Sequence, residues 1–300
     1  SLLQQLHVGR GRATHLAAIT LSATDFVGHR YGSGGVEMCL QLMTLDADLA
    51  TFFDVLDKTG IDYAVVLTGD HGGLDVPERL RLKGIAEATR VEASATPAGV
   101  GNEIASRLGL PEPVFTGDWY VTPSVPEARR VEVLALAREL LSAHPQVHSV
   151  HTAAEIAAHA MPEGPPSDWS ILDRLRASYR PDRSGHLLVV LKPHISPSAS
   201  PDSTGTHGSP WDYDRQVPML FWWEGIAPED RREDVMTIDI MPTLASLIGL
   251  PAPAGEIDGR CLDILTGPES NCRPDSVRPN ARAGKDRRAV RVHASSKEAR

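Results

Sequence analysis

The apolar residues of this chain occur in two patterns, short uninterrupted runs and longer stretches with a period of three to four residues. Uninterrupted runs lie at 15–22, 63–68, 187–191 and 217–223. Because these runs lack polar alternation, they predict buried strands of the kind that a parallel sheet contains. Pro218 in the last run favours an edge position for that strand, since proline donates no backbone hydrogen bond.

The periodic stretches predict amphipathic helices. Between 36 and 59 the apolar side chains recur every three or four residues, and Gly60 follows as a typical C-cap. A second helix is predicted at 237–248, where Pro242 lies close enough to the start to be tolerated. The first helix connects the first two strand runs. Strand, helix and strand form a βαβ unit, which implies a parallel sheet with a right-handed crossover.

The composition changes in the middle of the chain, where proline and alanine become frequent. Short helices are predicted at 131–142 and 153–160, and a strand at 114–121. No residue cluster in this region has the spacing of metal ligands or of a nucleophile. We therefore expect an α/β three-layer sandwich with a mostly parallel central sheet, built from a core at 1–75 and 185–267 and an inserted cap lobe at 76–184.

The net charge of −9 is unevenly distributed along the chain. Residues 268–300 carry nine Lys/Arg and four Asp/Glu, a balance of +5, so residues 1–267 carry a balance of −14. An acidic body argues against nucleic acid as the principal partner. The basic tail at 268–300 contains several prolines and no apolar periodicity, which predicts disorder. If the tail bound DNA instead, that binding would be sensitive to salt and lost on deletion of the tail.

Neither the cysteines nor the first residues of the chain indicate the cellular compartment of the protein. No apolar run approaches the ~18–20 residues of a membrane span. Cys39, Cys261 and Cys272 show no C-x-x-C spacing, so we expect no disulfide framework. The first residues show neither an initiating methionine nor a signal-peptide pattern, so we expect a chain that starts partway into a longer protein.

Asp and His side chains stand beside glycines at three places: Asp25 with His29, Asp70 with His71, and His207. The second pair directly follows a buried strand, and open α/β sheets bind their ligands at such carboxyl ends. Each place also has an ordinary interpretation as a turn, a helix cap or a structural histidine, and an acid beside an imidazole can be a catalytic pair. Their recurrence at strand ends favours metal ligands.

Oxygen and nitrogen donors of this kind suit Zn²⁺, with Mn²⁺ or Fe as alternatives. Five ligands exceed the capacity of one tetrahedral ion. Two ions about 3.5–4 Å apart would accommodate them and would suit an in-line displacement at phosphorus.

The three segments resemble the metal-binding motifs of the alkaline phosphatase superfamily, and they occur in the same order. The likeness lies in SATDFVGHRYG at 22–32, LTGDHG at 67–72 and THGS at 206–209, and continues in YDRQVP at 213–218 and IDIMPTL at 238–244. It covers roughly residues 10–265. The branch it resembles is that of the bacterial alkaline phosphatases with a threonine nucleophile, which are related to type I phosphodiesterases and nucleotide pyrophosphatases.

The resemblance implies two zinc ions bridged by the substrate's phosphate. Asp25, His29 and His207 match the ligands of one ion, and Asp70 and His71 match two ligands of the other. In the family, the remaining aspartate, the nucleophilic threonine and the asparagine, lysine and arginine that hold the phosphate all lie upstream of these motifs. We therefore expect an N-terminally truncated member.

We assign no catalytic nucleophile within this chain. Thr24, Thr68 and Thr206 stand beside the metal-binding motifs but do not match the nucleophile motif of the family.

The function implied by the resemblance is hydrolysis of a small phosphate monoester through a phospho-enzyme. Cleavage of a phosphodiester or nucleotide is the alternative, because the metal ions are common to both reactions. A metal-binding fragment that is inactive by itself is the other alternative. Family members are usually exported, which implies a periplasmic or secreted protein, whereas the sequence alone leaves compartment and oligomeric state open.

Overall fold

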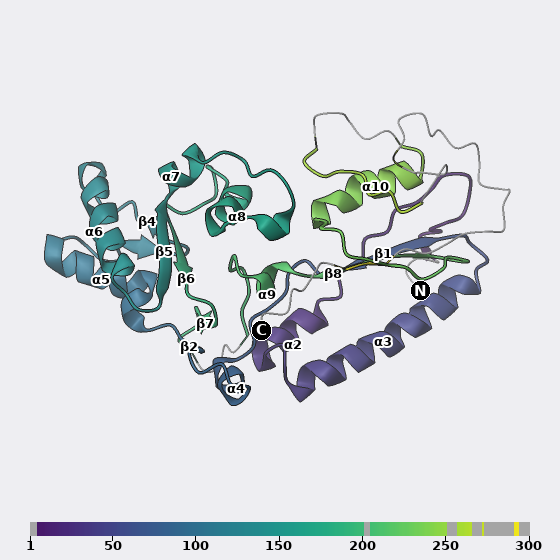
Figure 1. Ribbon diagram of the computed structural model, residues 1–300, viewed down its shortest axis with the longest axis horizontal. Helices are drawn as coiled ribbons and strands as arrows, with labels where there is room; N and C mark the ends of the chain where they lie inside the picture. Colours follow the sequence, from purple (N-terminus) through teal and green to yellow (C-terminus); the bar gives the residue numbers. More distant parts are fainter. Residues whose placement is uncertain (1–4, 201–204, 251–256, 266–271, 273–290, 294–300) are drawn as a thin grey trace.

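The computed structural model describes residues 5–200, 205–250, 257–265, 272 and 291–293, and Figure 1 shows two regions side by side, joined near α4 and α9. The helices are α2 (Ala23–Tyr31), α3 (Val36–Asp57), α4 (Pro77–Leu82), α5 (Pro97–Leu108), α6 (Arg130–Ser142), α7 (Ala153–Ala158), α8 (Ile171–Ser178), α9 (Asp212–Arg215) and α10 (Ile240–Leu247). The strands are β1 (Ala64–Thr68), β2 (Thr89–Arg90), β3 (Phe115–Thr116), β4 (Tyr120–Val121), β5 (Val147–Thr152), β6 (Leu187–Leu191), β7 (Ile195–Ser196), β8 (Pro218–Trp223), β9 (Asp230–Arg231) and β10 (Arg291–His293).

A four-stranded sheet in the order β1-β8-β10-β9 forms the centre of the first region. Side chains alternate along β8, so that Met219 and Phe221 are buried in a cluster with residues of α10. Trp222 instead contacts Phe53 of α3, with ring centroids 6.1 Å apart. Helices therefore cover both faces of the sheet, α10 above and α3 below in Figure 1, and the three-layer α/β arrangement is confirmed.

The second region has a hydrophobic core of its own. Ile104 of α5 and Leu141 of α6 are fully buried in it, together with Val147 of β5 and Leu187 of β6. β5 and β6 form an antiparallel pair that carries α6 on one side. We call this region the lobe; it includes β6, which lies outside the segment 76–184 that was expected to form it.

Several predicted elements are confirmed close to their predicted bounds. The helix predicted at 36–59 is α3, and Gly60 behind it has φ +67°. The strand predicted at 63–68 is β1, and the short helices predicted in the lobe are α6 and α7. The last predicted helix is α10, preceded by a 3₁₀ turn at Thr237–Asp239.

The prediction of a strand at 15–22 is wrong. Within the described chain this segment forms no ladder, and Leu16 and Ile19 are 82% and 56% exposed. The predicted parallel βαβ unit is therefore not formed, and β1 pairs with β8 in antiparallel orientation. Parallel pairing occurs elsewhere, between β9 and β10 and between β2 and β7. An apolar run becomes a strand only where a neighbour offers backbone partners, which periodicity does not reveal.

Two further strand assignments are corrected. β8 lies between β1 and β10 and is therefore not an edge strand. Pro218 is tolerated because it is the first residue of the strand, where a missing donor costs little. β6, predicted as part of the core sheet, pairs with β5 of the lobe instead.

The C-terminal part also differs from expectation. Cys261 and Cys272 form a disulfide with their Cα atoms 5.7 Å apart, a pairing that the sequence did not predict. Within the tail predicted to be disordered, Arg291–His293 forms β10 and pairs with β8 and β9. The remaining tail residues lie outside the described part of the chain.

Candidate metal centre

Helix α2 presents the first two candidate ligands. Asp25 lies in its first turn and His29 in its last, four residues apart and hence on the same face. The acidic Asp25 at the N-terminal end of the helix and the basic His29 at the C-terminal end also complement the helix dipole. The Oδ1 atom of Asp25 lies 3.5 Å from Nε2 of His29.

The turn after β1 presents the next pair. His71 is held by its own turn, because its Nδ1 lies 2.8 Å from the carbonyl oxygen of Gly72. Asp70 is the outermost candidate, with a side chain 88% exposed, and its Oδ1 lies 3.7 Å from Nε2 of His71. The pair sits at the carboxyl end of a strand, as the sequence predicted.

The loop that carries His207 is fastened directly to α2. Gly205 donates its N–H to the carbonyl oxygen of His29 over 3.0 Å, and its own carbonyl lies 3.0 Å from Nδ1 of His29. A Cβ at position 205 would lie 1.9 Å from the carbonyl oxygen of Gly28, so only glycine permits this approach.

These three segments bring their side chains together around Asp25. Besides His29, the Nε2 atoms of His71 and His207 lie 3.7 Å and 3.8 Å from the same carboxylate oxygen. The rings of His71 and His207 stack with centroids 3.4 Å apart, and Nε2 of His207 lies 3.2 Å from Nε2 of His29. All five predicted ligands thus converge, with Asp70 at the rim.

The donor set fits a divalent metal ion. Ligand atoms of Asp25, His71 and His207 lie within 4.8 Å of one another. For His29 and His71, the contact of Nδ1 with a backbone carbonyl requires an N–H at Nδ1 and leaves the lone pair of Nε2 directed into the cluster. Zinc-ligating histidines have this second hydrogen bond as a rule. The compact group combines ligands from both predicted sets, so their division between two ions stays a prediction.

The electrostatics of His207 favour the neutral form that binds metals. Burial lowers the pKa of its imidazole, and the neighbouring His71 and His29 lower it further, against the opposing effect of Asp25 and Asp214. A neutral imidazole offers its lone pair near neutral pH without first releasing a proton.

One residue in contact with these loops was not singled out from the sequence. Asp214 of α9 is 5% exposed and accepts hydrogen bonds at Oδ2 from the backbone N–H and hydroxyl of Ser209. Its backbone carbonyl accepts the N–H of Gly72 over 2.7 Å. The only signal for Asp214 in the sequence is its place in the YDRQVP segment, and that segment gives no indication that the residue is buried.

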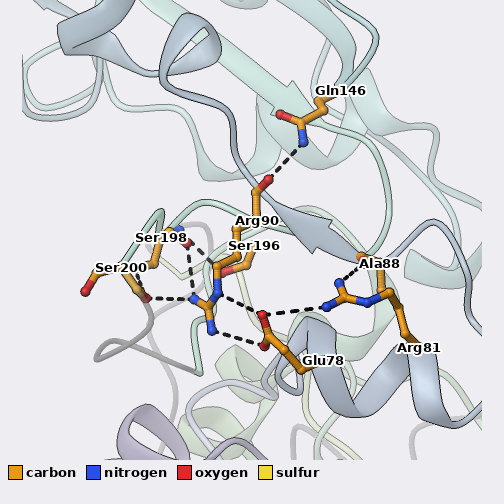
Figure 2. A network of polar contacts seen from close by, with 8 residues as sticks. All are labelled: Glu78, Arg81, Ala88, Arg90, Gln146, Ser196, Ser198 and Ser200. Atoms are coloured by element: carbon orange, nitrogen blue, oxygen red, sulfur yellow. Dashed lines mark hydrogen bonds and ion pairs between the residues drawn. The ribbon is translucent and has the colours of Figure 1, made fainter.

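A polar network holds the chain that leads towards the His207 loop (Figure 2). The Nη1 atom of Arg90 on β2 donates to the carbonyl oxygens of Ser198 and Ser200 over 3.4 Å and 2.7 Å. Its Nε and Nη2 atoms each lie 3.1 Å from a carboxylate oxygen of Glu78. Gln146 donates to the backbone carbonyl of Arg90 over 2.9 Å. The network thereby attaches the segment up to Ser200 to β2 and α4.

The other polar candidates take structural positions. Asp46 and Asp48 are exposed on α3. Two histidines of the lobe have a carboxylate partner: His159 lies 2.7 Å from Asp173, and His144 lies 3.5 Å from Glu92. No helix in the described residues has the length and apolarity to cross a bilayer.

Comparison with known proteins gives consistent matches. Residues 2–210 match the family of type I phosphodiesterases and nucleotide pyrophosphatases. The chain is 46% identical over 279 residues to alkaline phosphatase PhoK of a Sphingomonas species, covering 90% of this chain and 50% of that protein. It is 42% identical over 279 residues to alkaline phosphatase PhoD of Zymomonas mobilis, covering 90% of this chain and 48% of that protein.

Among solved structures, the crystal structure of alkaline phosphatase PafA matches with a TM-score of 0.74 and 24% identity, over 87% of this chain and 49% of that one. This similarity shows a shared fold. The chain spans about half the length of the curated relatives it matches.

Proposed function

Since this chain belongs to the type I phosphodiesterase and nucleotide pyrophosphatase family, within the alkaline phosphatase superfamily, we propose that it forms the metal-binding part of a phosphohydrolase. The observation that carries the proposal is the convergence of three imidazoles on one carboxylate oxygen of Asp25. Structural histidines do not require such a grouping, whereas a metal ion does.

In this proposal the residues hold two divalent ions, for which zinc is the first choice. Asp25, His29 and His207 hold one ion, and Asp70 and His71 contribute to the other. When bound, the ions polarise the phosphoryl group and stabilise charge on the attacking and leaving oxygens. The carbonyls of Gly205 and Gly72 keep two imidazoles in the ligating orientation.

The substrate we propose is a small phosphate monoester, hydrolysed through a phospho-enzyme. Support comes from relatives that are named alkaline phosphatases. Hydrolysis of phosphodiesters or nucleotides is the second candidate, favoured by the name of the matching family. With the full-length protein that contains this chain, p-nitrophenyl phosphate should be hydrolysed faster than bis(p-nitrophenyl) phosphate. The reverse order would favour the second candidate.

We also propose that these 300 residues by themselves are catalytically incomplete. The family's nucleophile motif has no match at Thr24, Thr68 or Thr206. The chain should therefore bind zinc but hydrolyse p-nitrophenyl phosphate poorly or not at all. Robust turnover that Asp70→Ala abolishes would reveal a nucleophile within the chain and contradict this part of the proposal.

Metal binding itself is the decisive test. The metal-free chain is titrated with zinc in competition with a chromogenic chelator, and Asp25→Ala is compared with Asp46→Ala on the exposed face of α3. Loss of the central carboxylate should weaken zinc binding by at least ~100-fold, beyond the 10- to 100-fold typical of groups that only support a ligand. Asp46→Ala should bind as the wild type does. Equal affinity of the two variants, or no zinc binding by the wild type, would contradict the proposal.

We propose an oxidising compartment, periplasmic or extracellular, for the protein. The disulfide between Cys261 and Cys272 supports this, because such bonds persist mainly outside the reducing cytosol.

A further inference from the structure

We propose that Asp214 is a positioning residue of the metal centre: its buried carboxylate holds the His207 loop, its backbone carbonyl holds the His71 turn, and its negative charge favours a divalent cation between them. The inference rests on the proposed metal site and adds a residue that provides no metal ligand itself.

The first support is the contact of Asp214 with the His207 loop. Its Oδ2 atom accepts the backbone N–H of Ser209 over 2.8 Å and also the hydroxyl of the same residue. Ser209 lies two residues after His207. The carboxylate thus fixes the backbone directly behind that ligand.

The second support is the contact with the His71 turn. The backbone carbonyl of Asp214 accepts the N–H of Gly72 over 2.7 Å, and the carbonyl of Gly72 in turn orients the ring of His71. One residue of α9 therefore contacts both segments that carry the stacked imidazoles.

The third support is the unused oxygen. Oδ1 of Asp214 is buried and has no hydrogen-bond partner among the described residues. A buried carboxylate oxygen without a donor costs free energy, so its retention calls for a compensating interaction. The charge of Asp214 acts electrostatically on His207 and His71, and a cation held by those imidazoles would compensate it.

The same helix provides a matched control. Asp212 has the same side chain two residues away, but it is exposed, and its Oδ1 lies 2.9 Å from Arg174 and 3.2 Å from Arg215. Asp212→Asn removes the same charge from the same helix without touching either metal-binding loop.

The experiment compares zinc affinity and thermal stability of the metal-free chain for the wild type, Asp214→Asn and Asp212→Asn. Asparagine keeps an oxygen for the donors of Ser209 and removes the charge. Asp214→Asn should weaken zinc binding about 10- to 100-fold, as outer-shell substitutions typically do. It should not lower the melting temperature of the metal-free protein, because it removes a buried uncompensated charge. Asp212→Asn should leave zinc affinity unchanged within about twofold.

Two results would overturn the inference: equal zinc affinity of the two variants, or a loss of affinity accompanied by an equally marked loss of metal-free stability, which indicates a role in folding alone. If Asp214→Asn does not fold, Ser209→Ala takes its place. That variant loosens the carboxylate without removing it and should bind zinc several-fold more weakly, and unchanged affinity would again overturn the inference. Absence of zinc binding by the wild type would overturn both this inference and the proposed function.

Discussion

At the scale of single residues, the candidate metal centre contains a close backbone contact at Gly72. The N–H groups of Gly72 and Gly73 donate to the carbonyls of Asp214 and Tyr213 over 2.7 Å and 2.9 Å. A Cβ on Gly72 would lie 2.1 Å from the carbonyl oxygen of Tyr213, whereas a Cβ on Gly73 would meet nothing nearer than 3.8 Å. Position 72 therefore has no room for a side chain, whereas position 73, in the same turn, does.

This difference gives a prediction with a built-in control. Gly72→Ala should force the two segments apart and destabilise the protein by about 1–3 kcal/mol, as overpacking does. Because His71 is oriented by the carbonyl of residue 72, zinc affinity should fall as well. Gly73→Ala should have little effect on either quantity. Thermal melts and zinc titrations of both variants test this, and equal behaviour of the two would contradict the structural reason given.

The residues of the candidate site were predictable to different degrees. The short motifs around Asp25, His29, Asp70, His71 and His207 were enough to predict a common site, and the structure brings these five side chains together. Asp214 carries no such signal. Its importance arises from burial and from contacts with Ser209 and Gly72 that only the folded chain creates.

At the scale of elements, α8 shows how local capping contributes to stability. Asp173 accepts the backbone N–H of Ser170 and its hydroxyl, which closes a capping box, and it also lies 2.7 Å from His159. The hydroxyl of Ser170, followed by His159, lowers the pKa of Asp173 to about 2. Since the ionised form is preferred in the folded state, its contribution to stability is present above pH ~4 and lost as the pH falls towards 2.

Acidification should therefore weaken α8 more in the wild type than in a variant without this carboxylate. We expect the difference in melting temperature between wild type and Asp173→Asn to be clear at pH 5, to shrink below pH ~4 and to be lost only as the pH falls towards 2. Ser178→Ala, at the other end of α8, serves as a control that should show no such pH dependence. A constant difference across this range would contradict the assignment.

Elements were predictable where one sequence pattern determines them. The apolar period of 36–57 determines α3 by itself, and the same holds for α6. Strand pairing depends on which segments meet, so β6 could be recognised as a strand but not as the partner of β5. The disulfide partners likewise carry no diagnostic spacing.

At the scale of the whole molecule, the disulfide attaches Cys272 to the segment that packs on the core sheet. Leu262 and Ile264, next to Cys261, are buried with Met219 and Phe221 of β8. Closing a loop between residues 11 apart contributes roughly 3 kcal/mol in chain-entropy terms.

Reduction of this bond should lower the melting temperature by several degrees, and Cys272→Ser should reproduce the effect without reductant. Cys39→Ser, which removes the exposed free thiol of α3, should leave the melting temperature unchanged. A thiol reagent should titrate one group in the native protein and three after reduction and unfolding. Three reactive thiols without reductant would show that the disulfide does not form.

The hydrogen bonds between His29 of α2 and Gly205 join residues that are 176 positions apart in sequence. Contacts of such separation form late in folding, after the intervening chain has closed the loop. Up to that moment Asp25 and His29 lack the imidazole of His207, so a chain in which residues 205–207 have not yet reached α2 cannot present the complete donor set. If the candidate site binds zinc as proposed, we therefore expect binding only after this contact has formed, so that zinc uptake reports this folding step. In an exported protein, the surroundings outside the cytosol would then decide which metal the site receives.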